Sequence, residues 1–219
     1  MKTGKRNPKS QVPNGHDAMG RKSPGRTAFV PAGRLAGWAD RFAASHGGLM
    51  SATDTDDGVL LAMRDGAAAV LTAPWPDDGR PGRGTGLVER MVSLASQERR
   101  LGLVLVRRGG YGVGIVVAGK LVASKVGTAS ARSRGGDAGA AVAERAAAEA
   151  AKIFASRGFE YLATGGDRLL VEGTLSMPAL RSVSGRPRLV PLAVADPKMP
   201  VLEKAAVDFC AVRVQITDP

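Results

Sequence analysis

The sequence contains few of the residues that mark metal-binding and disulfide-bonded proteins. There is one cysteine, Cys210, so no internal disulfide can form. The two histidines, His16 and His46, do not combine with Cys210 in any metal-ligand spacing. We therefore expect a protein of a reducing compartment, the cytoplasm, that binds no metal and uses no cofactor.

Long apolar runs and acidic residues are also scarce. No stretch reaches the roughly 20 apolar residues of a membrane span, and the basic N-terminus lacks the apolar core of a signal peptide. Lysine and arginine number 31 against 20 aspartates and glutamates, which gives a net charge of +11. This balance favours nucleic acid as the partner, ahead of an anionic membrane surface. We expect a soluble protein with no membrane partner.

Familiar hydrolase arrangements are missing. His16 lies in the N-terminal tail and His46 at a helix end, so neither supports a Ser/His/acid or Cys/His arrangement. A metal centre of the RNase H type needs acids at the ends of adjacent strands, and residues 100–127 contain none. The acids Asp167, Glu172 and Asp196 lie elsewhere. Any chemistry must come from a loop.

Residues 1–28 and 29–219 differ in composition. Residues 1–28 carry seven basic residues against one acid, with proline, glycine and asparagine between them, and cannot bury enough surface to offset chain entropy. We expect a disordered basic arm, which either contacts RNA phosphates or only aids solubility. The remaining residues, 29–219, are long enough for one well-buried domain.

Hydrophobic patterns predict an α/β domain with a mixed sheet and packed helices. An amphipathic helix over 31–46 ends at Gly47-Gly48, strands 59–64 and 67–75 flank the hairpin signal Asp65-Gly66, and a helix covers 87–97. Strands 100–108, 110–118 and 120–126, separated by glycine turns, are predicted to be antiparallel neighbours. We place the hairpin in the same sheet.

The second half alternates strands and helices. An alanine-rich helix over 139–157, with Asp137 as its cap, is predicted to pack closely on one face of the sheet. A short strand from Tyr161 precedes a helix that Asp167 caps. Residues 188–197 are predicted to form a strand, followed by a helix near Pro200 and a closing strand.

Two glycine motifs resemble phosphate-binding loops. GYGVG (110–114) lies inside a strand and opens no helix, so we interpret its glycines as allowing close packing or twist. TGGDR (164–168) lies between a strand and a helix, where amides could hold an anion. The simpler interpretation, a tight turn with Asp167 as cap, is favoured there.

The segment SKVGTASARSRGGDAG (124–139) is the candidate site. It joins an apolar strand to the alanine-rich helix and combines cations with glycines that free the backbone. Two arginines beside Gly109 are either an edge charge pair or an RNA contact. The candidate RNA-binding residues are Lys125, Arg132, Arg134, Arg107 and Arg108, and the candidate loop glycines are Gly127, Gly135 and Gly136.

From about residue 30 to residue 219, the chain resembles the actinobacterial Vms-like release factors, which are peptidyl-tRNA hydrolases. These are relatives of the catalytic middle domain of eukaryotic and archaeal class I release factors. The resemblance is carried by PAGRLAGWADRFAASHGG, LVLVRRGGYGVGIVVAGKLVASKVG, LATGGDRLLVEGTL and ADPKMPVLEKAAVDFCAVRVQITDP. It implies an RNase H-like fold without the metal site.

The resemblance also implies a partner. In the family, the loop after SKVG enters the peptidyl transferase centre of the large ribosomal subunit, beside the CCA end of peptidyl-tRNA. A glutamine in that loop, in the pattern Gly-Gly-x-x-Gln, positions water against the ester. The implied partners are the large subunit, its rRNA and peptidyl-tRNA, with the protein a monomer away from the ribosome.

This sequence departs from the family in the loop itself. The loop has no glutamine and no aromatic residue, and Glu144 and Glu149 stand in a helix that is strongly basic in the family. No catalytic residue can therefore be assigned. Three interpretations remain open: a ribosome-associated protein for rescue, quality control or protection with weak or no hydrolysis, an active hydrolase in which backbone amides, aided by Ser130 or Ser133, position water, and a general RNA-binding protein.

Overall fold

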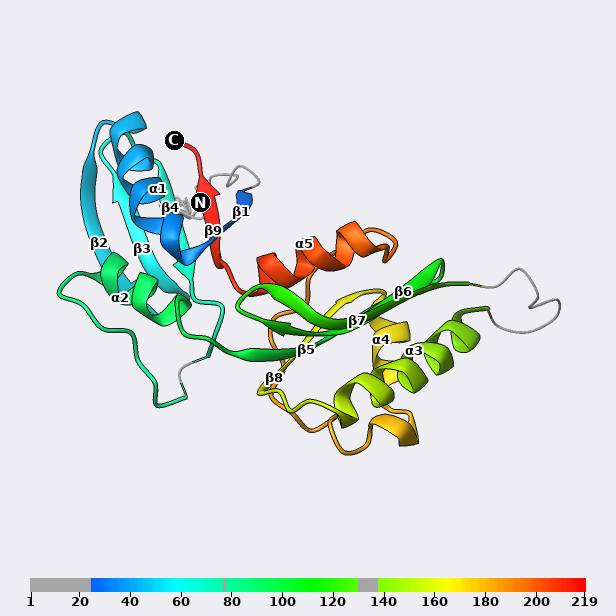
Figure 1. Cartoon of the computed structure of the whole chain (residues 1–219). Helices are drawn as coiled ribbons and strands as arrows, with labels where there is room; N and C mark the ends of the chain where they lie inside the picture. The colour runs from blue at the N-terminus through cyan, green and yellow to red at the C-terminus, as the bar shows by residue number, and fades with distance from the viewer. Residues whose placement is uncertain (1–24, 77, 130–137) are drawn as a thin grey trace, which may run out of the picture.

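The computed structural model describes residues 25–76, 78–129 and 138–219 and contains two β-sheets (Figure 1). The first sheet is antiparallel with strand order β1-β9-β4-β3-β2, and the second has the order β7-β6-β5-β8. In the second sheet β5 pairs with β8 in parallel, whereas β5, β6 and β7 are antiparallel neighbours. The α/β class, the mixed sheet and the order of its central strands are confirmed.

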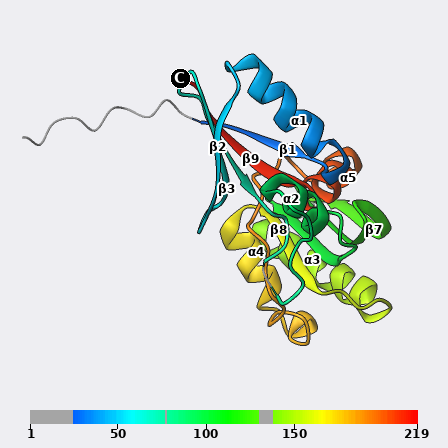
Figure 2. The same ribbon diagram turned by 90° about the vertical axis from the view of Figure 1, so that its left-hand side faces the viewer.

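The first sheet consists of two segments that are far apart in the sequence. Its strands are β1 (Arg26–Val30), β2 (Leu49–Thr55), β3 (Gly58–Met63), β4 (Ala68–Thr72) and β9 (Val212–Thr217). Helices α1 (Ala32–Ser45) and α2 (Leu87–Ala95) cover one face (Figure 2). The prediction of a single sheet is wrong: the closing strand β9 inserts between β1 and β4, and joins them to the hairpin in a sheet with its own apolar core.

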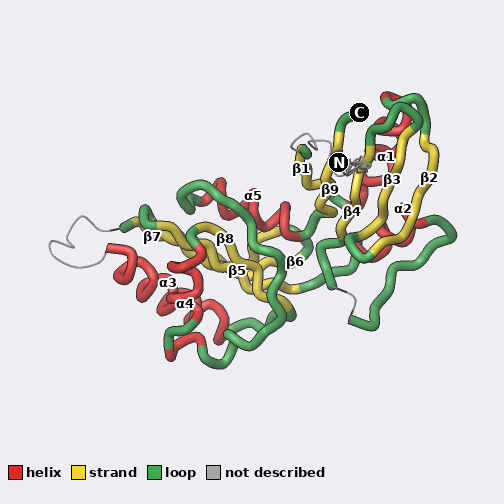
Figure 3. The backbone as a smooth tube through the Cα atoms, turned by 180° about the vertical axis from the view of Figure 1, so that it is seen from behind, coloured by secondary structure: helices red, strands yellow, loops and turns green. Residues whose placement is uncertain are grey.

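The second sheet has helices on both faces. It consists of β5 (Arg100–Arg107), β6 (Gly110–Val117), β7 (Lys120–Thr128) and β8 (Tyr161–Gly166). Helices α3 (Ala138–Ala155) and α4 (Arg168–Leu175) and the 3-10 turn η1 (Pro178–Leu180) lie on one face, and α5 (Met199–Phe209) on the other (Figure 3). The alternation of side chains in β5 explains the layers: Leu103 and Leu105 pack with the α5 side, and Val104 and Val106 with the α3 side.

Three local expectations differ from the structure. Strand β1 begins at Arg26, inside the segment expected to be an arm; residues 1–24 of that segment lie outside the described residues. Strand β2 was not predicted, because all of its residues are exposed and no apolar alternation marks it. Residues 188–197 run beside β8 through single parallel bridges at Arg188 and Leu192 but form no regular strand, since Pro191 has no N–H to donate.

A buried arginine fastens the segment between β4 and α2 to the second sheet. The side chain of Arg99 is 0% exposed and donates to Asp78 (2.8 and 3.1 Å), Gln97 (2.7 Å) and Glu160 (3.2 Å). Arg80 also pairs with Asp78 and Glu160 from the exposed side. This network lies at the start of β5 and β8, opposite the ends where those strands finish.

Among the described residues, no helix is both long and apolar enough to cross a membrane.

Candidate functional site

Three strands of the second sheet finish at one edge. Strand β8 is parallel to β5, and β7 runs in the same direction because both β5 and β7 are antiparallel to β6. The carboxyl ends of β5, β7 and β8 therefore lie together, and α3, α4 and α5 begin at the same end of the sheet (Figure 1). We call this end, with residues 107–110, 127–129, 166–168 and 196–199, the strand-end edge.

Backbone hydrogen bonds hold the strand-end edge together. The amide of Ala129 donates to the Gly109 carbonyl (2.9 Å), which ties the end of β7 to the β5–β6 turn. The amide of Asp167 donates to the Val106 carbonyl (2.8 Å) and ties the start of α4 to β5. The segment that links β7 to α3 thus leaves from a rigid frame.

Most of the predicted loop lies outside the described residues. Arg132, Arg134, Gly135 and Gly136 fall within residues 130–137, as do Ser130, Ser133 and the predicted cap Asp137. The structure places the two ends of the segment, Ala129 and Ala138, and the predicted residues of the strands beside it.

Gly127 is required by the packing of an aromatic ring. It pairs with Tyr111 across β6 and β7, and a Cβ at Gly127 would lie 2.5 Å from ring atoms Cε1 and Cζ of Tyr111. Tyr111 is 5% exposed, and burial together with the nearby charge of Glu149 raises the pKa of its hydroxyl. Only glycine lets this ring lie against the last part of the strand before the loop.

Lys125 lies beside acidic and basic groups of α3. Lys152 Nζ donates to Glu149 Oε1 (2.7 Å), and this hydrogen bond, with a smaller attraction from Lys125, holds the pKa of Glu149 below its usual value. Glu149 is therefore an anion that two lysines share. Lys125 itself is exposed, in β7 two residues before Gly127.

The two neighbouring arginines have different surroundings. Arg107 Nη1 donates to the Val194 carbonyl (2.7 Å), and its Nε lies 3.4 Å from Asp196 Oδ1. Arg107 therefore attaches the segment before α5 to the end of β5. Arg108 is exposed, and its side chain forms no hydrogen bond or ion pair with any residue that the structure describes.

The two glycine motifs have structural roles. Gly112 lies in β6, where a Cβ would meet Leu202 Cδ1 at 2.9 Å, so the glycine allows α5 to pack closely. In TGGDR, the Asp167 carboxylate accepts from the amides of Leu169 (3.0 Å) and Leu170 (3.2 Å). The interpretation of Asp167 as a helix cap is confirmed.

The strand-end edge carries positive potential from its backbone as well as from its side chains. Each helix N-terminus bears a partial positive charge, and three helices begin here. The first turn of α5 has no side-chain cap, and because Pro200 has no N–H, the amides without a side-chain acceptor there are those of Met199 and Val201. In α4, the Asp167 carboxylate accepts from two of the first amides. Together with Arg108, this arrangement can hold phosphate oxygens.

Acid–base groups with catalytic geometry do not occur among the described residues of this edge. His46 Nδ1 lies 2.8 Å from Asp65 Oδ2, but this pair belongs to the first sheet, at the end of α1. No group of three or more potential metal ligands occurs in the described ranges. The described residues of this edge can bind and orient an anionic partner.

Two features of the site were missed from the sequence. In the sequence, Tyr111 was interpreted only as part of a glycine-rich strand. Its pairing with Gly127 becomes visible once the register of β6 and β7 is known. Asp196 was considered only as a possible catalytic acid, and its pairing with Arg107 spans a long sequence separation. An aromatic residue flanked by glycines in an antiparallel strand was the available signal for Tyr111.

Comparisons with known proteins identify a family for this region. Residues 99–215, more than half of the chain, match the family model described as the Actinobacteria/chloroflexi VLRF1 release factor. The matched residues include the whole second sheet with its helices and most of β9. No match was found among the curated proteins searched.

Proposed function

The chain belongs to the Actinobacteria/chloroflexi VLRF1 release factor family, and from this premise we propose that it acts on the large ribosomal subunit. Membership supports a release-factor-like, ribosome-associated function. In the proposal, the strand-end edge faces rRNA and directs the segment 130–137 toward the peptidyl transferase centre, beside the CCA end of peptidyl-tRNA. The protein would serve in rescue, quality control or protection of stalled subunits.

The observation that carries the proposal is the convergence of three strand ends and three helix N-termini where this segment departs. A segment with Arg132 and Arg134 leaves a frame that is itself electropositive. RNA contacts of this kind, made by cations and backbone amides to phosphates, position a protein without reading sequence. This suits a factor that must reach one place on the ribosome whatever peptide is attached.

Peptide release by this chain is proposed to be slow or absent. The chain contains Gln11, Gln97 and Gln215. Gln97 is held by Arg99 and by the Arg80 carbonyl just before β5, and the eight residues of β5 place it about 25 Å from the strand-end edge. Gln215 lies in β9 of the first sheet, and Gln11 in the segment before residue 25. Neither described glutamine can orient water at the proposed site.

The experiment uses the purified protein and large subunits that carry peptidyl-tRNA. Binding and peptide release are measured in the same samples. We expect saturable binding, with release at most a weak residual rate above buffer. Rapid release that is lost when the segment 128–136 is shortened would instead favour hydrolysis by backbone amides. Equal affinity for unrelated RNA would favour a general RNA-binding protein.

The salt dependence of the affinity for the large subunit tests whether the strand-end edge faces rRNA. Each lost phosphate contact flattens the slope of log affinity against log salt by about 0.7 to 0.9, and we expect this change for Arg108→Ala. Arg157→Ala is the matched control, because Arg157 is also exposed but follows the far end of α3. An unchanged slope for Arg108→Ala, or an equal change for both variants, would contradict the proposed orientation.

A further inference from the structure

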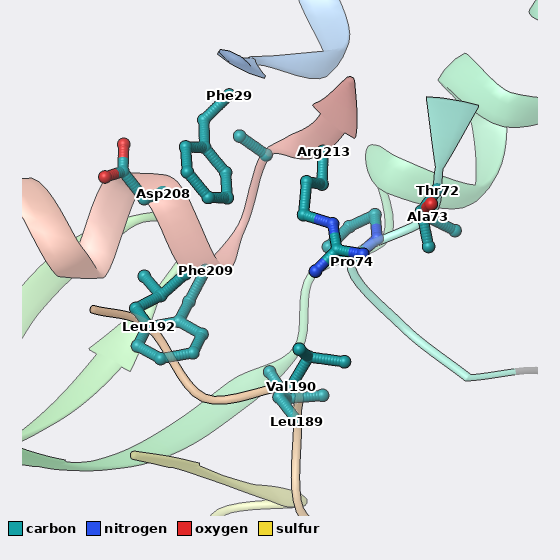
Figure 4. Close-up of a pocket in the computed structure, with 11 residues that line it drawn as sticks. Phe29, Thr72, Ala73, Pro74, Leu189, Val190, Leu192, Asp208, Phe209 and Arg213 are labelled. Atoms are coloured by element: carbon teal, nitrogen blue, oxygen red, sulfur yellow. The ribbon is translucent and has the colours of Figure 1, made fainter. Parts of the chain in front are cut away.

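A small pocket lies where the first sheet meets the second. It is formed by the ends of β1, β4 and α5, the start of β9 and the segment beside β8 (Figure 4). Its walls are mostly apolar, with Thr72, Asp208 and Arg213 as the polar residues of the lining. The residues that the argument uses are Phe29, Pro74, Leu189, Val190, Phe209 and Arg213. The pocket lies at the C-terminal end of α5, whereas the strand-end edge lies at its N-terminal end.

Arg213 is placed in the pocket by strand register. It lies in β9 directly between Phe29 of β1 and Thr72 of β4. Its neighbours Val212 and Val214 point to the core under α1 and α2, so Arg213 points to the opposite face. Figure 4 shows its guanidinium directed among the apolar side chains of the pocket.

The guanidinium has no partner among the residues that the structure describes. Its Nε–H is buried and donates to no acceptor, and no hydrogen bond or ion pair of the side chain is formed within those ranges. Asp208 also lines the pocket, but its carboxylate accepts from Lys204 Nζ (2.5 Å) and points away from Arg213 in Figure 4. Within the described residues, the pocket therefore contains a cation that lacks a counter-ion.

An unpaired, partly buried guanidinium is costly, and an arginine cannot relieve the cost by losing its proton. A planar guanidinium is matched best by a carboxylate or phosphate that accepts two parallel hydrogen bonds. The apolar walls require that the same ligand also carries an apolar group. These two requirements define an amphiphilic anion.

The size of the pocket limits the apolar group. The cavity volume is about 60 Å³. A water molecule needs about 10 to 15 Å³ by the same measure, so the cavity holds about four to six groups of that size. A branched aliphatic side chain fits this space, whereas a nucleobase with its sugar is too large. Val190, 62% exposed at the rim, offers apolar surface to the remainder of a longer ligand.

We propose that this pocket binds a carboxylate carried on a short branched aliphatic group. The carboxylate oxygens accept from the Arg213 guanidinium, and the aliphatic group lies between Phe209, Pro74 and Leu189. Two sources share this chemistry: a free branched-chain carboxylic acid, and the C-terminal residue of a polypeptide that ends in leucine, isoleucine or valine. The inference does not depend on the proposed ribosomal function.

The test is a titration of the full-length protein with 4-methylpentanoate and with its neutral counterpart, 4-methylpentanamide. Binding is followed through the Arg213 Nε–H resonance, which is assigned by its loss in Arg213→Met. We expect a saturable shift with the acid and at least tenfold weaker binding of the amide. Equal binding of acid and amide, or no saturable shift with the acid, would overturn the proposal.

Substitutions in the pocket distinguish binding at Arg213 from nonspecific binding elsewhere on the protein. Arg213→Met keeps the aliphatic stem and should weaken acid binding, read from ligand signals, by about ten- to a hundredfold, the usual effect of losing a charge-assisted hydrogen bond. Arg34→Met, an exposed arginine on α1, is the control and should change nothing. Val190→Glu changes only the exposed rim and should also weaken binding by repulsion, so the test survives if Arg213→Met fails to fold. Undiminished binding in Val190→Glu and in a folded Arg213→Met would refute the site.

A comparison with peptides shows whether the natural ligand is a polypeptide C-terminus or a free carboxylic acid. Peptides ending in Ala-Ala-Leu are compared as free acid and as C-terminal amide. A peptide acid that binds at least tenfold more tightly than 4-methylpentanoate assigns the pocket to polypeptide C-termini. Equal affinities of the two acids assign it to a free carboxylic acid.

Discussion

Replacing Gly127 with alanine is expected to destabilise the protein through one contact. The added Cβ would lie 2.5 Å from Cε1 and Cζ of Tyr111 and 2.6 Å from its hydroxyl oxygen. The ring cannot yield easily, because Tyr111 is buried in the apolar cluster between the second sheet and α3. Strand β7 must therefore shift, and the cost of such overpacking is about 1 to 3 kcal/mol.

The assay is thermal unfolding. For a chain of this length, each kcal/mol lowers the melting temperature by about 2 to 4 °C, so Gly127→Ala should lower it by about 2 to 12 °C. Gly173→Ala is the control, since a Cβ there meets nothing within 4 Å. Because Gly173 lies inside α4, alanine should stabilise the protein by about 0.5 to 1 kcal/mol.

A second substitution identifies the contact. In Tyr111→Leu the planar ring is gone, so adding Gly127→Ala should cost almost nothing or stabilise the strand slightly. The coupling energy between the two positions should then be about 1 to 3 kcal/mol. The reasoning is refuted if Gly127→Ala destabilises the Tyr111→Leu protein as much as it destabilises the wild type.

Three further predictions concern the Arg99 network, the helix cap Asp167 and the thiol of Cys210. Arg99→Met should lower the unfolding free energy by about 3 kcal/mol, because it removes the buried guanidinium and leaves Asp78 and Glu160 with only the exposed Arg80 as a cationic partner. Arg80→Met, which removes the exposed arginine of the same network, should cost less than about 1 kcal/mol in denaturant titrations. Asp167→Ala should cost about 1 kcal/mol through loss of the helix cap, and Asp167→Asn should retain most of the stability if the cap is the cause. Burial raises the pKa of the Cys210 thiol to about 11. Because only the thiolate reacts, alkylation at pH 8 should be about a hundredfold slower in the folded protein than in the unfolded one, and its rate in the folded protein should rise with pH up to the folded pKa. Equal alkylation rates in the two states would refute the burial argument.

The part of the fold that the sequence predicts well is the part built from local signals. Glycine turns separate β5, β6 and β7, and their antiparallel pairing is expected because short turns join them. Asp167 caps α4 where a polar residue comes after two glycines. Strand β2 gave no such signal, because a strand exposed on both faces has no apolar alternation.

Long-range pairing accounts for what the sequence did not predict. Nothing near residues 212–217 indicates that they pair with β1 and β4 rather than with the neighbouring strand of the second sheet. The contact between Tyr111 and Gly127 depends on the β6–β7 register, and the pocket around Arg213 collects residues from four separate segments of the chain. Side chains brought together in this way leave no pattern in a single sequence.

The position of the strand-end edge is set by the order and direction of the strands. The groups that bind an anionic partner there are therefore independent of any group in 130–137 that performs chemistry. Helices α3 and α4 begin at the strand-end edge because β7 and β8 finish there, and α5 begins at the same edge after the segment that Arg107 holds to the end of β5. Substitutions in that segment can remove a water-positioning group, which commonly costs about 3 to 4 kcal/mol of transition-state stabilisation, without removing the dipoles and cations of the frame. Under the proposed function, changes to the frame, such as Arg108→Ala, should therefore weaken ribosome binding, whereas changes within 130–137 test peptide release.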